Sequence, residues 1–167
     1  MNIKNGRVGW KDLVSTPTKG TVLIVDDDAE IRRSLQRLVT HLGYSAQTAS
    51  SSEEADNWLT LQRFMVCILD IELPRMNGVE FLDWALRRDP EMAVLMLTGM
   101  DVPEIAIECI DGGARTYLVK PVEVDFLRLA LRDALAMRGI LVERNDLVSR
   151  DIESHVEVPR STGSNHV

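Results

Sequence analysis

The sequence predicts an α/β fold with a doubly wound, five-stranded parallel sheet that carries helices on both faces. Two observations support this class. Short apolar runs and segments of helical periodicity alternate five times between residues 21 and 141. The central runs are continuously apolar, which is typical of strands buried on both faces of a parallel sheet. This alternation requires parallel strands joined by right-handed crossovers.

The first half of the chain supplies three strands and two helices. Apolar runs predict strands at residues 22–25 and 64–69, and residues 44–49 are predicted as a weaker strand between them. A stripe at helical spacing, formed by Ile31, Leu35, Leu38, Val39 and Leu42, predicts a helix that ends at Gly43. The positions between them, Arg32, Arg33, Gln36 and Arg37, are predicted to face outward. Ser50 to Ser52 supply capping hydroxyls for a second helix that runs to about Arg63.

The second half repeats the pattern twice. After a loop over residues 74–78, a helix from Val79 is stopped by Asp89-Pro90, and residues 93–97 form a buried strand. A helix from about Val102 ends at Gly112-Gly113, with Ile105, Ala106, Cys109 and Ile110 predicted to be buried. Residues 117–119 form the fifth strand, and a last helix carries an apolar face to about Leu141.

These elements give one domain with short extensions. A flavodoxin-like strand order 2-1-3-4-5 is the expected topology for this alternation. We expect residues 1–20 to be a flexible leader, residues 21–141 to be the domain, and residues 142–167 to be a helical linker or a disordered tail, because the apolar pattern thins after residue 142.

Composition excludes several functional classes. The formal charge of −7 argues against a surface that binds nucleic acid directly, and no segment has the apolar length of a membrane span or the pattern of a secretory signal. We therefore expect a cytoplasmic protein. The two cysteines, Cys67 and Cys109, lie inside apolar patterns and are predicted to be buried thiols.

Polar side chains end four of the predicted strands. Asp26 and Asp27 follow the first strand, Asp70 the third, Thr98 the fourth and Lys120 the fifth. In the predicted topology these four strands are neighbours, and ligands bind at the carboxyl edge of such sheets. We therefore expect the five side chains to converge on one pocket.

The chemistry of this set indicates phosphoryl transfer. Carboxylates about 4 Å apart repel by roughly 4 kcal/mol per pair at an effective dielectric constant near 20. A hard divalent cation, Mg²⁺ or Mn²⁺, offsets that repulsion, with the backbone carbonyl of Glu72 as a further ligand. Lys120 adds a mobile positive charge, and Asp70 becomes a carboxylate nucleophile that accepts a phosphoryl group.

Residues 22–28, 68–78, 94–99 and 117–121 resemble the motifs of the receiver domains of two-component response regulators, and the resemblance covers about residues 20–140. It implies that Asp70 is the phosphoacceptor and that Asp26, Asp27, Asp70 and the Glu72 carbonyl hold Mg²⁺. It further implies that Thr98 and Lys120 bind phosphoryl oxygens, that Thr98 and Tyr117 form a conformational switch, and that the Lys120-Pro121 bond is cis.

Four residues depart from the family pattern. Glu72 and Met100 stand two residues after Asp70 and Thr98, at sites that in the family modulate the lifetime of the aspartyl phosphate. Arg115-Thr116 replaces an acidic pair that DNA-binding members often carry, which argues against their dimer face in this chain.

The resemblance also implies partners. A sensor histidine kinase or phosphotransfer protein supplies the phosphoryl group, and a downstream protein, or a second copy of the chain, responds to the switched face. Arg32, Arg33 and Arg37 are either a solvated helix face or a contact for the kinase.

Two alternatives stay open at this point. The run Val25-Asp26-Asp27-Asp28 also resembles the first motif of haloacid-dehalogenase-like phosphohydrolases, in which Asp26 would be the nucleophile and Asp28 an acid. A pseudo-receiver that is never phosphorylated and serves as a docking module is the other alternative. Sequence also leaves open whether the chain is a stand-alone receiver or part of a longer protein.

Overall fold

A single parallel sheet forms the centre of the molecule. The computed structural model describes the backbone of residues 20–155 and the side chains of residues 20–139. The strands are β1 (Thr21–Val25), β2 (Ser45–Ala49), β3 (Val66–Asp70), β4 (Ala93–Thr98) and β5 (Thr116–Val119). All four strand pairings are parallel and the order is β2-β1-β3-β4-β5, as predicted.

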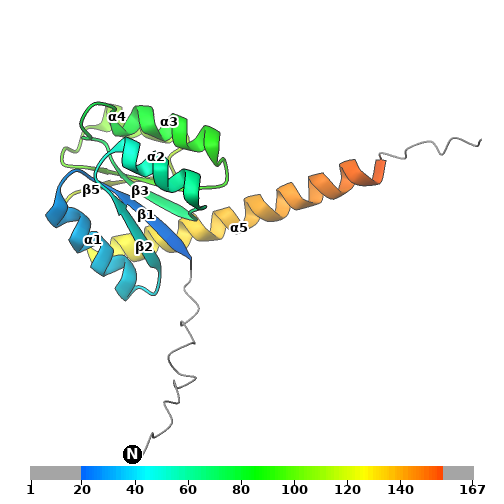
Figure 1. Ribbon diagram of the computed structural model, residues 1–167, viewed down its shortest axis with the longest axis horizontal. Helices are drawn as coiled ribbons and strands as arrows, with labels where there is room; N and C mark the ends of the chain where they lie inside the picture. Colours follow the sequence, from blue (N-terminus) through cyan, green and yellow to red (C-terminus); the bar gives the residue numbers. More distant parts are fainter. Residues whose placement is uncertain (1–19, 156–167) are drawn as a thin grey trace, which may run out of the picture.

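Helices cover both faces of the sheet (Figure 1). They are α1 (Ala29–His41), α2 (Ser52–Leu61), α3 (Gly78–Arg88), α4 (Pro103–Asp111) and α5 (Val124–His155). In Figure 1, α2, α3 and α4 lie on one side of the strands and α1 and α5 on the other. The helices and the sheet thus form three layers. Because the strands are parallel, the carboxyl ends of β1, β3, β4 and β5 lie at one edge of the sheet.

The alternation of side chains along each strand divides the core in two. Leu23, Cys67 and Met96 pack with residues of α2, α3 and α4, whereas their neighbours Ile24, Ile68 and Leu95 pack with residues of α1 and α5. All six side chains are fully buried. Because both faces are covered, the central strands β1, β3 and β4 bury nearly every residue, which explains their continuous apolar runs.

Local capping explains where the helices begin. The side chain of Asp28 accepts the backbone N–H groups of Glu30 and Ile31, so Asp28 is the N-cap of α1. Ser51 and Asn77 cap α2 and α3 in the same way, through the N–H groups of Glu54 and Glu80. These caps fix the loops that leave the carboxyl edge of the sheet.

Several predictions about individual residues need correction. Phe64 is buried but precedes β3, which begins at Val66. Ile110 was predicted to be buried, yet its residue is 47% exposed because it lies on the flank of α4, away from Cys109, which is fully buried. Arg32 was predicted to face outward, but it is half-buried and its guanidinium binds a backbone carbonyl.

The last helix runs past residue 141, the predicted end of the domain. α5 continues as one helix to His155 and leaves the body of the molecule (Figure 1). The domain limits at residues 21 and 141 stay predictions. Residues 1–19 of the predicted leader (1–20) and residues 156–167 of the predicted tail lie outside the described residues. Within residues 20–155, none of the helices combines the length and apolar character needed to cross a membrane.

Candidate functional site

Three acids meet at the carboxyl edge of the sheet. Asp26 follows the last residue of β1, Asp27 comes next, and Asp70 is the last residue of β3. One carboxylate oxygen from each lies within 4.8 Å of the other two. Asp26 and Asp70 are buried and Asp27 is exposed, so the cluster has a closed floor and one side open to solvent.

Lys120 lies on the other side of this cluster. Its ammonium is 2.7 Å from Oδ2 of Asp26 and 2.8 Å from Oδ2 of Asp70, and so forms ion pairs with both buried acids. Lys120 directly follows β5, and the Lys120-Pro121 peptide bond is cis, as predicted. The four ionisable side chains that were expected to converge therefore do so.

Burial and pairing act against each other on these charges. Burial raises the pKa of Asp26, although hydrogen bonds from Lys120 and the Asp28 amide oppose the shift. Burial alone would lower the pKa of Lys120, but the carboxylates of Asp26 and Asp70 outweigh it and raise that pKa. The buried Asp26 charge thus costs folding free energy, and the positive charge of Lys120 offsets part of that cost.

The donor set suits a hard divalent cation. Three carboxylate oxygens converge around an open side, which is how carboxylates commonly hold Mg²⁺ together with water. The backbone N–H of Glu72 donates to Oδ1 of Asp70 at 3.2 Å, so this residue contacts the cluster through its amide. The predicted role of the Glu72 carbonyl as a metal ligand stays a prediction.

The two predicted switch residues share one hydrogen-bond partner. Thr98 is buried, and its hydroxyl donates to the carbonyl of Met100 at 2.9 Å and accepts the Met100 N–H at 3.0 Å. The hydroxyl of Tyr117 donates to the same carbonyl at 2.9 Å. Thr98 and Tyr117 are thus linked through the β4–α4 loop, since both of these hydrogen bonds of the Thr98 hydroxyl are made with that loop.

Two further residues shape the site, and the sequence pattern did not identify them. Gly78, the first residue of α3, packs so closely on Asp70 that an added Cβ would lie 2.1 Å from the Asp70 carbonyl oxygen. Arg32 donates from its guanidinium to the carbonyl oxygen of Asp26. The sequence pattern predicted Gly78 only as the end of the loop over residues 74–78, and Arg32 only as part of an outward face.

Replacing Asp26 with Asn should have opposite effects on stability and on cation binding. Burial raises the pKa of Asp26 in the folded state above its value in the unfolded chain, so the neutral carboxyl group favours folding. This favourable contribution to the free energy of unfolding is complete below the unfolded-state pKa and is lost as the pH rises through the folded-state pKa. At neutral pH without cation, Asp26→Asn should therefore raise the melting temperature, and this gain should shrink on acidification.

The same variant should lose stabilisation by Mg²⁺. The wild type should gain about 2.7 kcal/mol when free Mg²⁺ is about 100 times its Kd, whereas Asp26→Asn lacks one anionic ligand. Thermal unfolding with and without Mg²⁺ measures both effects. Equal Mg²⁺ stabilisation of the two proteins would show that Asp26 is not a ligand.

Comparison with known proteins agrees with this geometry. Residues 22–132 match the family model described as the response regulator receiver domain. The alginate biosynthesis transcriptional regulatory protein AlgB of Pseudomonas syringae pv. tomato is 36% identical over 126 residues, which cover 75% of this chain and 28% of that protein. The response regulator protein PilR of Pseudomonas aeruginosa is 31% identical over 117 residues, covering 70% of this chain and 26% of PilR.

Solved structures show the same fold. A response regulator receiver domain protein from Clostridium thermocellum superimposes with a TM-score of 0.69 at 32% identity, covering 72% of this chain and 98% of that one. NtrX from Brucella abortus gives a TM-score of 0.73 at 29% identity, covering 77% of this chain but 30% of NtrX. The chain spans about a third or less of the length of the curated relatives cited here, and its matched part is a signalling domain. It belongs to the response regulator receiver domain family.

Proposed function

We propose that this chain accepts a phosphoryl group on Asp70 from a phosphohistidine of a sensor kinase or phosphotransfer protein, with Mg²⁺ held by Asp26, Asp27 and Asp70. The observation that carries the proposal is the double ion pair of Lys120 with Asp26 and Asp70 beside a three-carboxylate cluster. A bound Mg²⁺ would supply positive charge to the phosphoryl oxygens. Mn²⁺ has the same preference for oxygen ligands and could replace it.

The transfer is a displacement at phosphorus. A carboxylate oxygen of Asp70 attacks, a P–O bond forms, the P–N bond to the donor imidazole breaks, and the imidazole nitrogen takes up a proton. Charge then moves from the Asp70 carboxylate to the phosphoryl oxygens, so Lys120 follows it and exchanges its contact with Asp70 for a phosphoryl oxygen. The hydroxyl of Thr98 must leave the Met100 carbonyl to donate to another phosphoryl oxygen.

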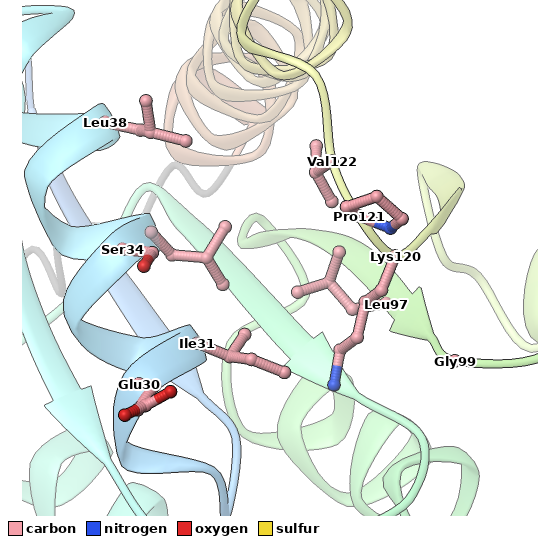
Figure 2. A pocket seen from close by; sticks show the side chains of 10 residues that line it. Glu30, Ile31, Ser34, Leu38, Leu97, Gly99, Lys120, Pro121 and Val122 are labelled. Carbon is pink, nitrogen blue, oxygen red and sulfur yellow. The ribbon is translucent and has the colours of Figure 1, made fainter.

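A hollow next to Lys120 offers the kinase a docking place. Its volume is about 590 Å³, and α1, the end of β4 and the loop after β5 line it. Figure 2 shows Ile31, Leu97 and Val122 around this space, with the Lys120 ammonium at its edge. An apolar helix surface of the donor that packs there would place its phosphohistidine beside Asp70. Arg33 and Arg37, both exposed on α1, can then pair with acids of the kinase.

Release of the Met100 carbonyl would transmit the signal to α4, β5 and α5. Large apolar side chains are exposed over these elements, namely Ile107, Ile110, Val119, Phe126 and Leu129. Such a patch is typical of a protein-binding surface. We propose that a downstream protein binds it after Thr98 and Tyr117 move; concentration-dependent dimerisation on phosphorylation would instead assign the patch to a second copy.

The test is phosphorylation by a small acyl phosphate, followed by mapping. The chain should gain the mass of one phosphoryl group with Mg²⁺ and none with a chelator. Borohydride reduction, which marks acyl phosphates, should place that group on Asp70. Label on Asp26, Asp27 or Asp28, or label that forms equally in chelator, would overturn the proposal.

The alternatives lose their support. A phosphohydrolase of the haloacid-dehalogenase type needs Asp28 as an acid, but this carboxylate caps α1. A docking module without phosphorylation would not need the buried charges of Asp26 and Asp70. We propose that the domain catalyses only its own phosphorylation and dephosphorylation. We further propose that the protein acts in the cytoplasm and does not bind nucleic acid directly.

A further inference from the structure

Arg32 contacts the part of the backbone that carries the metal-binding acids. From the first turns of α1 its side chain folds back toward the end of β1, and Nη1 donates to the carbonyl oxygen of Asp26 at 2.5 Å. That carbonyl belongs to the peptide plane between Asp26 and Asp27. The guanidinium therefore acts on the link between a buried and an exposed member of the acid cluster.

The two acids are held in different ways. The N–H of Asp26 donates to the carbonyl of Ala49 on β2, and its Oδ1 accepts the N–H of Asp28 at 2.8 Å, so Asp26 is fixed by its own contacts. Asp27 is exposed, so its side chain is less tightly packed than that of the fully buried Asp26. The direction of its carboxylate depends on the peptide planes that flank it, and Arg32 holds the first of these planes.

We propose that Arg32 is a positioning residue of the cation site: by binding the Asp26 carbonyl, it orients Asp27 toward the cation. The proposal rests on the metal site proposed above. It gives a function to the one arginine of the α1 cluster whose position contradicted the sequence prediction.

If Arg32 acted only through its charge, it would weaken cation binding rather than support it. A positive side chain near a cation site repels the cation, so removing it should tighten binding by a small factor. Glu54 offsets part of this repulsion. Hydrogen bonds from Ser50 lower the pKa of Glu54, and the positive charge of Arg32 lowers it further, so the two opposite charges interact. Positioning of a ligand predicts instead that the loss of Arg32 weakens binding. The sign of the change therefore separates the two accounts.

The decisive comparison is between Arg32→Gln and Arg33→Gln in the full 167-residue chain. Both variants remove one positive charge from adjacent residues of α1, but Arg33 is exposed. Mg²⁺ affinity is measured by isothermal titration calorimetry, and Mn²⁺ affinity by electron paramagnetic resonance of the free ion. Neither measurement depends on phosphorylation.

Arg32→Gln should weaken cation binding about tenfold or more, which is the usual cost of losing a residue that orients a metal ligand. Arg33→Gln should change it by less than about twofold, as expected for an exposed charge. Arg32→Lys keeps the charge but loses the planar donor group, so it should also bind more weakly than the wild type.

Thermal unfolding without cation separates positioning from folding. A purely structural role would lower the melting temperature of Arg32→Gln and leave the cation Kd unchanged, and that result would overturn the proposal, as would tighter binding. If Arg32→Gln fails to fold, Arg32→Lys decides: wild-type affinity in that variant overturns the inference. Failure of the wild type to bind either cation would instead refute the metal site itself, and this inference with it.

Discussion

Asp70→Asn is expected to abolish phosphorylation by a small acyl phosphate while the fold stays intact. The amide has the shape of the carboxylate but neither its negative charge nor its nucleophilic oxygen. Lys120 keeps Asp26 as an ion-pair partner at 2.7 Å, so the substitution leaves no buried ammonium without a counter-charge. A time course of phosphoryl incorporation with Mg²⁺ measures the effect, and incorporation should fall below detection.

Asp28→Asn is the matched control for this variant. It makes the same chemical change two residues after Asp26, at the N-cap of α1, where Asn caps about as well as Asp. Its phosphorylation should therefore stay close to that of the wild type. Undiminished incorporation in Asp70→Asn, or equal losses in the two variants, would mean that Asp70 is not the acceptor.

Gly78→Ala is expected to cost the largest amount of folding free energy among the substitutions considered. The new Cβ would lie 2.1 Å from the carbonyl oxygen of Asp70 and 2.7 Å from the Cα of Ile71. Both atoms belong to the main chain at the end of β3, and β3 is hydrogen-bonded to β1 on one side and β4 on the other. Since the strand cannot move aside, destabilisation of about 3 kcal/mol or more is expected.

The measurement is urea denaturation, with Gly139→Ala as control. Gly139 lies in α5, and an added Cβ there would meet no atom within 4 Å. Alanine at an open helical position should stabilise by roughly 0.5–1 kcal/mol, so the same substitution should act in opposite directions at the two sites. A wild-type midpoint for Gly78→Ala would contradict the close packing of α3 on Asp70. Displacement of Asp70 should also slow the phosphorylation of any Gly78→Ala that folds.

The convergence of the site could be predicted from the sequence because it depends on topology. Asp26, Asp70 and Lys120 each stand at the end of an apolar run, and a parallel sheet brings the carboxyl ends of its strands to one edge. No knowledge of side-chain packing was needed for this. The cap at Asp28 depends only on residues two and three positions further along the chain, so it is decided by local sequence.

The contacts that hold the side chains and loops of the site in place could not be predicted from strand ends alone. Periodicity assigned Arg32 to an outward face, yet a long side chain at the edge of that face reaches back to the end of β1. The shared carbonyl of Met100 depends on the path of the β4–α4 loop, and the pattern of apolar residues carries no information about that path. The predicted burial of Ile110 was wrong for a related reason, because helical spacing does not show how far a neighbouring element covers the flank of a helix.

The sequence by itself determined which residues end the strands and hence which charges meet, because local hydrogen bonding and the burial of apolar runs decide both. Only the tertiary structure decided how those charges are held. Lys120 forms ion pairs with two acids, and Arg32 donates a hydrogen bond to the carbonyl between Asp26 and Asp27. The close packing of α3 on the end of β3 leaves no room for a side chain at Gly78. These contacts join segments that are distant in the chain or reach around a loop, so they exist only once the layers have packed.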